Sequence, residues 1–198
     1  MAARDLFARG TRRERRLPGE AGVWVVVIGD LLAFAVLFGT FMVLRADHPE
    51  AFAAGQAAMD VDLGILNTLL LLTGSLMIAR AVAAYRDGAR DVARRSVVFT
   101  IVCGLVFVGV KVVEYRAKID AGLVPDDSPF FLLYFTFTGI HLLHVLIGLV
   151  VLLYMRTLAG REQPDARDRE AFESGATFWH MVDLLWLVLF ALFYLVHA

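Results

Sequence analysis

The chain has 198 residues and a formal net charge of −1, and 59% of its residues are hydrophobic. Its mean hydropathy of +0.68 excludes an ordinary soluble domain, and its length excludes more than one bundle of membrane helices. A single cysteine, Cys103, excludes an intramolecular disulfide and a metal site built from several cysteines. The composition predicts a single all-α transmembrane domain over residues 22–198, behind a basic N-terminal tail of residues 1–21.

The first predicted transmembrane helix, residues 22–44, contains a carboxylate. Asp30 lies about 12 Å along this helix at 1.5 Å per residue, where ionising it without a partner would cost several kcal/mol. We expect either a functional carboxyl here or a protonated one that is hydrogen-bonded to a neighbouring helix.

The second predicted helix, residues 62–84, follows a polar loop of residues 45–60. It contains Asn67, Thr68 and Ser75, which are side chains of the kind that join membrane helices by close approach and interhelical hydrogen bonds. We interpret them as helix-packing residues.

The third predicted helix, residues 96–115, has Gly104, Phe107, Lys111 and Glu114 on one face. Lys111 and Glu114 are three residues apart, so an intrahelical ion pair is expected. That face points either into the bundle or toward a lipid headgroup.

The fourth predicted helix, residues 130–154, has no formal charge but contains two histidines. Thr138, His141, His144 and Gly148 share one face of the helix. Because lipid cannot satisfy the nitrogens of imidazole, we expect this face to contact other helices.

The fifth predicted helix, residues 175–197, contains Trp179, His180, Asp183 and Trp186. Trp179 lies near the predicted start, where it could be an interfacial aromatic anchor. Asp183 lies roughly 12 Å into the helix, which favours a buried role for its carboxyl.

The distribution of Lys and Arg predicts the topology. Of 19 such residues, 15 lie in or beside the N-terminal tail and the second and fourth loops. The positive-inside rule then puts the N-terminus in the cytoplasm and the C-terminus outside, in a multi-pass protein of the bacterial plasma membrane. At helical rise, one set of polar residues falls in the cytoplasmic half and another in the outer half, with His141 between them. The first set is Asp30, His144, His180 and Asp183, and the second is Asn67, Lys111 and Glu114.

Three kinds of chemistry remain open for the cytoplasmic set. HLLH and HMVD would supply four candidate ligands for iron, copper or zinc, although the Glu-x-x-His pattern of di-iron bundles is absent because Ala117 follows Glu114. The same groups could form a protonic network or hold a phospholipid headgroup. The third interpretation is a purely structural set of interhelical hydrogen bonds.

Five segments in succession resemble subunit III of the haem-copper oxidases. They are PGEAGVWVVVIGD, LNTLLLLTGS, GLVFVGVKVVEY, YFTFTGIHLLHVLIGL and FWHMVDLLWLVLFALFYL, and they cover all five predicted helices. The short form, with PGE before the first helix and VKVVEY in the third, looks most like the branch found with nitric oxide reductases and some bacterial terminal oxidases.

The resemblance implies a non-catalytic subunit with no catalytic residues and no metal of its own. Haem and copper would sit in partner subunits, while this chain would pack on the haem-bearing subunit I, bind structural phospholipid and support proton uptake. Asp30 stands where the family has a glutamate, Glu114 and Tyr115 match its EY, and Lys111 replaces a neutral amide of many members. The residues implied to be lipid-binding or proton-linked are Asp30, Glu114, His141, His144, Trp179, His180, Asp183 and Trp186, and those implied in helix packing are Asn67, Thr68, Ser75, Lys111 and Tyr115.

Our leading hypothesis is an accessory subunit of a respiratory haem-copper oxidase of the cytochrome c oxidase or nitric oxide reductase type. One alternative is an assembly factor that associates with subunit I only transiently. The other is a stand-alone membrane metalloenzyme that uses the histidines and aspartates.

Overall fold

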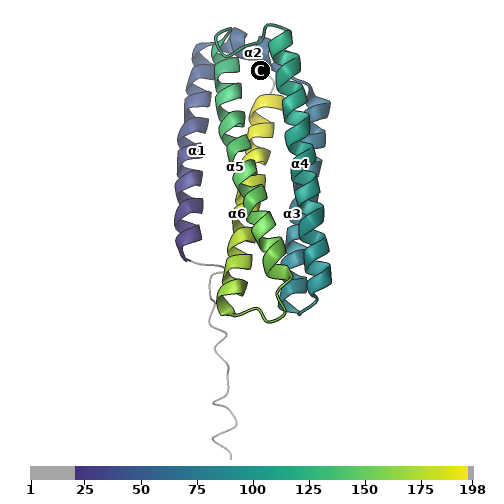
Figure 1. Cartoon of the computed structure of the whole chain (residues 1–198). Coiled ribbons are helices and arrows are strands. Elements are labelled where there is room, and N and C mark those ends of the chain that lie inside the picture. The colour runs from purple at the N-terminus through teal and green to yellow at the C-terminus, as the bar shows by residue number, and fades with distance from the viewer. Residues whose placement is uncertain (1–20, 196–198) are drawn as a thin grey trace, which may run out of the picture.

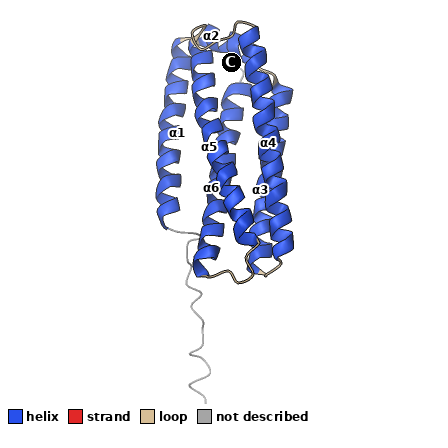
Figure 2. Cartoon of the chain, viewed as in Figure 1, coloured by secondary structure: helices blue, strands red, loops and turns tan. Residues whose placement is uncertain are grey.

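The computed structural model describes residues 21–195, which are helical with short connections and without strands (Figure 2). The elements are α1 (Ala21–Asp47), α2 (Pro49–Ala57), α3 (Val61–Arg86), α4 (Arg90–Asp120), α5 (Pro129–Ala159), α6 (Ala166–Phe190) and a π-helical turn, η1 (Ala191–Leu195). Five of the described helices are long and apolar enough to cross a membrane, namely α1, α3, α4, α5 and α6 with its π-helical extension. The predicted all-α membrane fold with five spans is confirmed. Residues 1–20 of the predicted tail and the end of the fifth span, including His197, lie outside the described residues.

The helices are longer than the hydrophobic segments that predicted them, most clearly in α6. This helix begins at Ala166 rather than at Gly175, because Asp165 and Asp168 form a capping box in which each side chain accepts a hydrogen bond from the backbone N–H of the other residue. Hydropathy identifies only the turns that lie in hydrocarbon, whereas polar turns continue beyond it. The first polar turns of α6 were therefore missed.

The predicted polar loop of residues 45–60 is wrong in part, because it contains α2. Pro49 occupies a first-turn position, where its missing N–H is harmless. Phe52 is fully buried, with its ring 5.1 Å from that of Phe41 and 5.6 Å from that of Phe130. Gly55 lies so close to α5 that a Cβ atom there would be 2.2 Å from the Phe130 ring. The short helix thus closes one end of the bundle.

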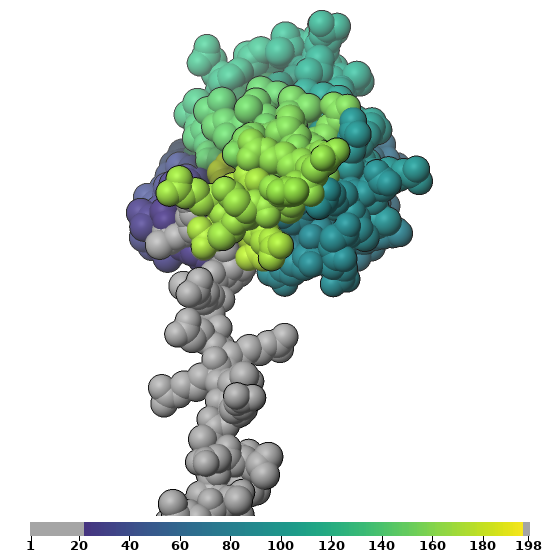
Figure 3. Space-filling model, turned by 60° about the horizontal axis from the view of Figure 1, so that its bottom comes forward, coloured from purple at the N-terminus to yellow at the C-terminus, as the bar shows by residue number. Residues whose placement is uncertain are grey.

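The packing of the long helices is uneven (Figure 1). α6 contacts α1, α3 and α5, and α3 lies along α4. The most apolar stretch of α6 is 56% buried, whereas that of α1 is 17% buried. Figure 3 shows α1 in purple at one edge and the teal α3–α4 connection on the opposite side. α6 is therefore the central helix and α1 the peripheral one.

The ends of the helices alternate between the two ends of the bundle. The α3–α4 and α5–α6 connections lie at the end where α1 begins, and α2, the α4–α5 connection and the end of α6 lie at the other (Figure 1). Gly88 and Gly122 have φ values of 75° and 80°, so each provides a backbone conformation that other residues rarely adopt, after α3 and after α4 respectively.

Candidate functional site

A buried ion pair lies at the centre of the half of the bundle that α2 closes. The Nζ of Lys111 is 2.9 Å from Oε2 of Glu114, and the two side chains are only 1% and 2% exposed. The predicted intrahelical pair is confirmed, and of the two expected directions the inward one is correct. Because the pair is away from both water and lipid, each charge depends on the groups around it.

Two tyrosines from other elements complete the pair. Lys111 donates to the hydroxyls of Tyr134 on α5, at 3.0 Å, and Tyr194 on η1, at 3.3 Å. Both hydroxyls in turn donate to Oε1 of Glu114, at 2.8 and 2.5 Å respectively. All three donors of the ammonium group are used and both carboxylate oxygens accept, so the network is satisfied. It joins α4, α5 and the π-helical turn.

Aromatic rings enclose the ammonium group of Lys111. Its Nζ lies 4.9 Å from the ring centroid of Tyr134, 5.2 Å from those of Tyr115 and Trp186, and 5.9 Å from that of Tyr194. Within about 6 Å, the negative face of a ring attracts a cation. These contacts offset part of the cost of removing Lys111 from water.

Further polar contacts extend this network toward both sides. Tyr115 shares a hydrogen bond of 2.6 Å with Thr138, which donates to the carbonyl of Tyr134 at 2.5 Å. Lys118 donates to the carbonyl of Ala58 at 3.3 Å, beside α2. Tyr115 therefore does bridge two helices, as a packing residue should.

The two histidines of α5 separate. His141 is fully buried, and its Nε2 donates to the carbonyl of Val182 on α6 at 3.0 Å. His144 lies at the α1 side of α5, where Nε2 is 3.3 Å from Oδ2 of Asp30 and Nδ1 is 2.9 Å from the carbonyl of Ile140. They contact different helices although they share a helix face.

The Asp30–His144 pair has the geometry to share a proton. A carbonyl oxygen can only accept, so Nδ1 of His144 carries a proton for Ile140. The Nε2 and the Asp30 carboxyl can then bond only if a proton lies between them, on either the ring or the carboxyl. The side chains of Asp30 and His144 are 27% and 15% exposed, so the pair lies at the surface of the chain.

Trp179 is enclosed by glycines from three helices. A Cβ atom on Gly104 or Gly148 would lie 3.1 or 3.0 Å from its ring, and one on Gly74 would lie 3.7 Å from it. Trp179 is 1% exposed, so its interpretation as an interfacial anchor is wrong. The earlier start of α6 explains the error, because Trp179 lies well inside the helix.

Trp186 is also buried. Its Nε1 donates to the hydroxyl of Thr68 on α3 at 3.0 Å, so Thr68 joins two helices. Asn67 is fully buried, but neither atom of its amide has a hydrogen-bond partner among residues 21–195. The interhelical hydrogen bond expected of Asn67 is therefore not seen in the described residues.

A second polar pair lies where α3 meets α6. The hydroxyl of Ser75 is 2.6 Å from Nδ1 of His180, and the Ser75 side chain also interacts with the carboxyl of Asp183. Asp183 is 7% exposed, whereas His180 is exposed at the bundle surface. The burial expected of the Asp183 carboxyl is confirmed.

The cytoplasmic set predicted by depth is thus two separate pairs. Asp30 meets His144, while His180 and Asp183 meet Ser75. Among residues 21–195, no group of three His, Cys, Asp or Glu side chains is placed to hold a metal ion. The HLLH and HMVD segments do not converge on one ligand set.

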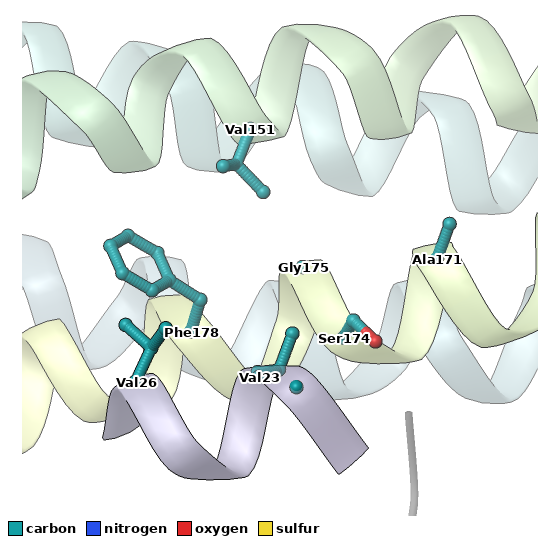
Figure 4. A pocket seen from close by; sticks show the side chains of 8 residues that line it. Val23, Val26, Val151, Ala171, Ser174, Gly175 and Phe178 are labelled. Atoms are coloured by element: carbon teal, nitrogen blue, oxygen red, sulfur yellow. The ribbon is translucent and has the colours of Figure 1, made fainter. Parts of the chain in front are cut away.

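An apolar cavity of about 380 Å³ lies where α1 begins, between α1, α5 and α6. Figure 4 shows Val23 and Val26 of α1 facing Val151 of α5 and Phe178 of α6 across it. The predicted lipid-binding residues do not line this cavity. Its lining has the apolar chemistry of an acyl-chain site rather than of a headgroup site.

Sequence reasoning missed Tyr134, Tyr194, Lys118 and Gln56. The two tyrosines lie in apolar segments where aromatic residues usually pack, and only the tertiary structure directs them at Glu114. Gln56, from the supposed loop, donates to the carbonyl of Leu192 at 3.2 Å. A glutamine among small apolar residues before the second span was the one available signal.

Comparison with known proteins gives a family match over residues 19–197, to the family described as cytochrome c oxidase subunit III. Subunit 3 of the cytochrome bo(3) ubiquinol oxidase of Pseudomonas aeruginosa is 28% identical, covering 89% of this chain and 84% of the relative. Cytochrome c oxidase subunit 3 of Thermostichus vulcanus is 30% identical, covering 88% and 85%. The haem-copper oxidase subunit I+III of Aeropyrum pernix is 26% identical, covering 89% of this chain and 22% of the relative. These relatives are named as oxidase subunits, and the resemblance to the nitric oxide reductase branch stays a prediction.

Proposed function

Since the chain belongs to the cytochrome c oxidase subunit III family, we propose that it is a resident, non-catalytic subunit of a respiratory haem-copper oxidase and packs on the haem-bearing subunit I. The observation that carries this proposal is the family match, which extends over all five membrane-spanning helices. The Aeropyrum pernix relative, whose name joins subunits I and III in one chain, supports subunit I as the partner.

Haem and copper belong to the partner subunits in this proposal, and oxygen is the substrate of the complex. The named relatives are oxidases of cytochrome c or ubiquinol, which favours oxygen over nitric oxide. The chain lies in the bacterial plasma membrane with its N-terminus in the cytoplasm. The basic α3–α4 and α5–α6 connections, which share one end of the bundle with the start of α1, support this orientation.

The proton-linked role is proposed for Asp30 and His144. The pair lies at a partly exposed position on the surface of the bundle, which would let it exchange a proton with a partner subunit. Phospholipid is proposed to bind at the α1 side, where the apolar cavity of α1, α5 and α6 suits an acyl chain. The buried Lys111–Glu114 network has the structural role of fixing α4, α5 and η1.

Purification of the tagged chain from its native membrane in mild detergent tests the proposal. We expect haem absorbance at a constant ratio to the chain, a large haem-bearing subunit among the co-purifying proteins, and oxygen consumption by the complex. Nitric oxide consumption without oxygen consumption would instead identify the reductase. Association only in newly synthesised material, followed by pulse-chase, would favour the assembly factor, and a chain eluting alone with stoichiometric metal would favour the metalloenzyme.

A further inference from the structure

His180 presents a polar side chain on the outer surface of the bundle, within the membrane-spanning part of α6. It lies about 8 Å beyond Gly175, where the apolar part of α6 begins, and about 22 Å from the end of η1 at helical rise. Its partner Ser75 lies about 21 and 17 Å from the two ends of α3. Because a hydrocarbon core is about 30 Å thick, both residues lie within it.

Lipid cannot satisfy this side chain. Imidazole has two ring nitrogens, and among the described residues only Nδ1 of His180 has a hydrogen-bond partner, Ser75. Acyl chains offer neither donors nor acceptors, and headgroups lie at the ends of the helices. Polar side chains at this depth almost always face protein or a water-filled cavity.

The other surface pair differs in this respect. His144 uses both of its ring nitrogens within the chain, through Ile140 and Asp30. Its polar groups are therefore satisfied without a partner subunit. Of the two surface histidines on α5 and α6, His180 is therefore the one whose Nε2 is left for a group from outside the chain.

Exposed leucines lie one helical turn from His180 and from Ser75. Leu184 follows it by one turn on α6 and is 49% exposed, and Leu72 precedes Ser75 by one turn on α3 and is 40% exposed. α6 contacts both α1 and α3, so its uncovered strip lies between these two helices. We call the surface formed by Leu72, Ser75, His180 and Leu184 the α3–α6 face.

We propose that the α3–α6 face is the docking surface for a transmembrane helix of the haem-bearing subunit, which supplies a polar side chain or a backbone carbonyl to Nε2 of His180. This inference rests on the proposed function, because that function supplies the partner. The leucines give the apolar contact and the imidazole gives a directional bond, which is how membrane helices associate when there is no hydrophobic driving force.

Site-specific photo-crosslinking in the intact complex tests the face. A benzophenone amino acid replaces Leu184, and in the matched control it replaces Leu105 of α4, which is 56% exposed and also lies near the middle of its helix. We expect a product with the haem-bearing subunit from position 184 and none from position 105. A product from position 105 alone would overturn the choice of face while leaving the proposed function intact.

The same experiment identifies other occupants. A crosslinked product of twice the chain's mass from position 184 would show that a second copy of the chain occupies the α3–α6 face. Lipid adducts alone would show that this face contacts the bilayer. Either result would overturn the inference. If no haem-bearing subunit co-purifies even with the unmodified chain, the proposed function itself fails.

Substitution of His180 measures the polar contact. We expect His180→Leu to lower the haem retained per chain about three- to tenfold in mild detergent, as loss of one interhelical hydrogen bond predicts, and His180→Gln to restore part of it. Thr40→Val is the control, since the exposed Thr40 hydroxyl is already bonded to the carbonyl of Val36 in its own helix. Unchanged haem retention in a His180→Leu chain that melts like the unmodified chain would contradict the proposal.

Discussion

At the scale of single residues, the Lys111–Glu114 pair combines two charges that would each be costly alone. The carboxylate accepts hydrogen bonds from Lys111, Tyr134 and Tyr194, and the lysine donates three. Removing one partner of a buried pair leaves the other charge uncompensated, which costs about 3–5 kcal/mol, whereas removing both can be nearly neutral. The network therefore predicts strong non-additivity.

We expect Lys111→Met to destabilise the purified chain by about 3–5 kcal/mol, and Lys111→Met with Glu114→Gln to recover most of that loss. Denaturant unfolding in detergent, followed by circular dichroism, gives both values. Arg86→Met is the control, because the Arg86–Glu173 pair is largely exposed and should contribute about 1 kcal/mol or less. Additive losses in the double variant would contradict a coupled pair.

Asp30 allows a structural role to be separated from a proton-linked one. Its bond to His144 is partly exposed, so Asp30→Asn should change the unfolding free energy by only about 1 kcal/mol. The amide cannot exchange a proton, so we expect the assembled oxidase to keep its haem but to sustain fewer turnovers. Oxygen-electrode traces with parallel haem quantification measure this. Unchanged turnover would remove Asp30 from proton delivery, and loss of haem would make it an assembly residue.

The contacts easiest to predict from the sequence were those between residues about one turn apart on the same helix. Lys111 and Glu114 were predictable because helical periodicity places residues three apart side by side. Depth along the membrane correctly matched Asp30 with His144, but it could not separate this pair from His180 and Asp183. Depth gives only the position of a residue along the membrane normal. Deciding which residues meet also requires the order of the helices around the bundle.

At the scale of elements, the packing of α6 depends on three glycines of the neighbouring helices, which leave space for the ring of Trp179. Gly74, Gly104 and Gly148 come from three helices and all face the ring of Trp179. A glycine inside a helix costs about 1 kcal/mol relative to alanine. Close packing of the tryptophan offsets this cost, and it explains why small residues appear in apolar segments as a stripe.

We expect Gly104→Ala to destabilise the chain by about 1–2 kcal/mol, because overpacking costs about 1–3 kcal/mol and outweighs the gain in helix propensity. Its Cβ atom would lie 2.8 Å from Leu149 and 3.1 Å from Trp179. Gly109→Ala on the same helix is the control, since a Cβ there meets nothing within 4 Å. It should be neutral or stabilising by up to about 1 kcal/mol. The two variants are compared by their thermal unfolding in detergent. Equal stability of Gly104→Ala and Gly109→Ala would contradict the close packing of Gly104 against Trp179.

The number of membrane-spanning helices was easier to predict from the sequence than the residues at which the helices begin and end. Five apolar segments specified five spans, because only a helix satisfies its backbone in lipid. The polar start of α6 and the short α2 were invisible to hydropathy, since their stability comes from the Asp165 cap and from the packing of Phe52 against Phe41 and Phe130. Both signals need tertiary or capping information.

At the scale of the whole molecule, one end carries the basic connections and the other carries α2. The Lys111 network lies toward the α2 end, and the apolar cavity lies toward the basic end. The positive-inside rule predicts that the basic end faces the cytoplasm. That orientation decides from which side of the membrane a proton would reach Asp30.

Cysteine labelling determines this orientation directly, because Cys103 is buried within α4 and should stay silent. Glu162 and Asp126 are exposed in the α5–α6 and α4–α5 connections, at opposite ends of the bundle. With a membrane-impermeant maleimide on intact cells, we expect Asp126→Cys to react at once and Glu162→Cys only after permeabilisation, while the unmodified chain gives the background.

The reverse labelling pattern would place the basic connections outside the cell, in conflict with the positive-inside rule. Asp30 lies nearer to the basic end, so that pattern would also move the Asp30–His144 pair to the outer half of the membrane. The role proposed for this pair in proton uptake from the cytoplasm would then have no physical basis.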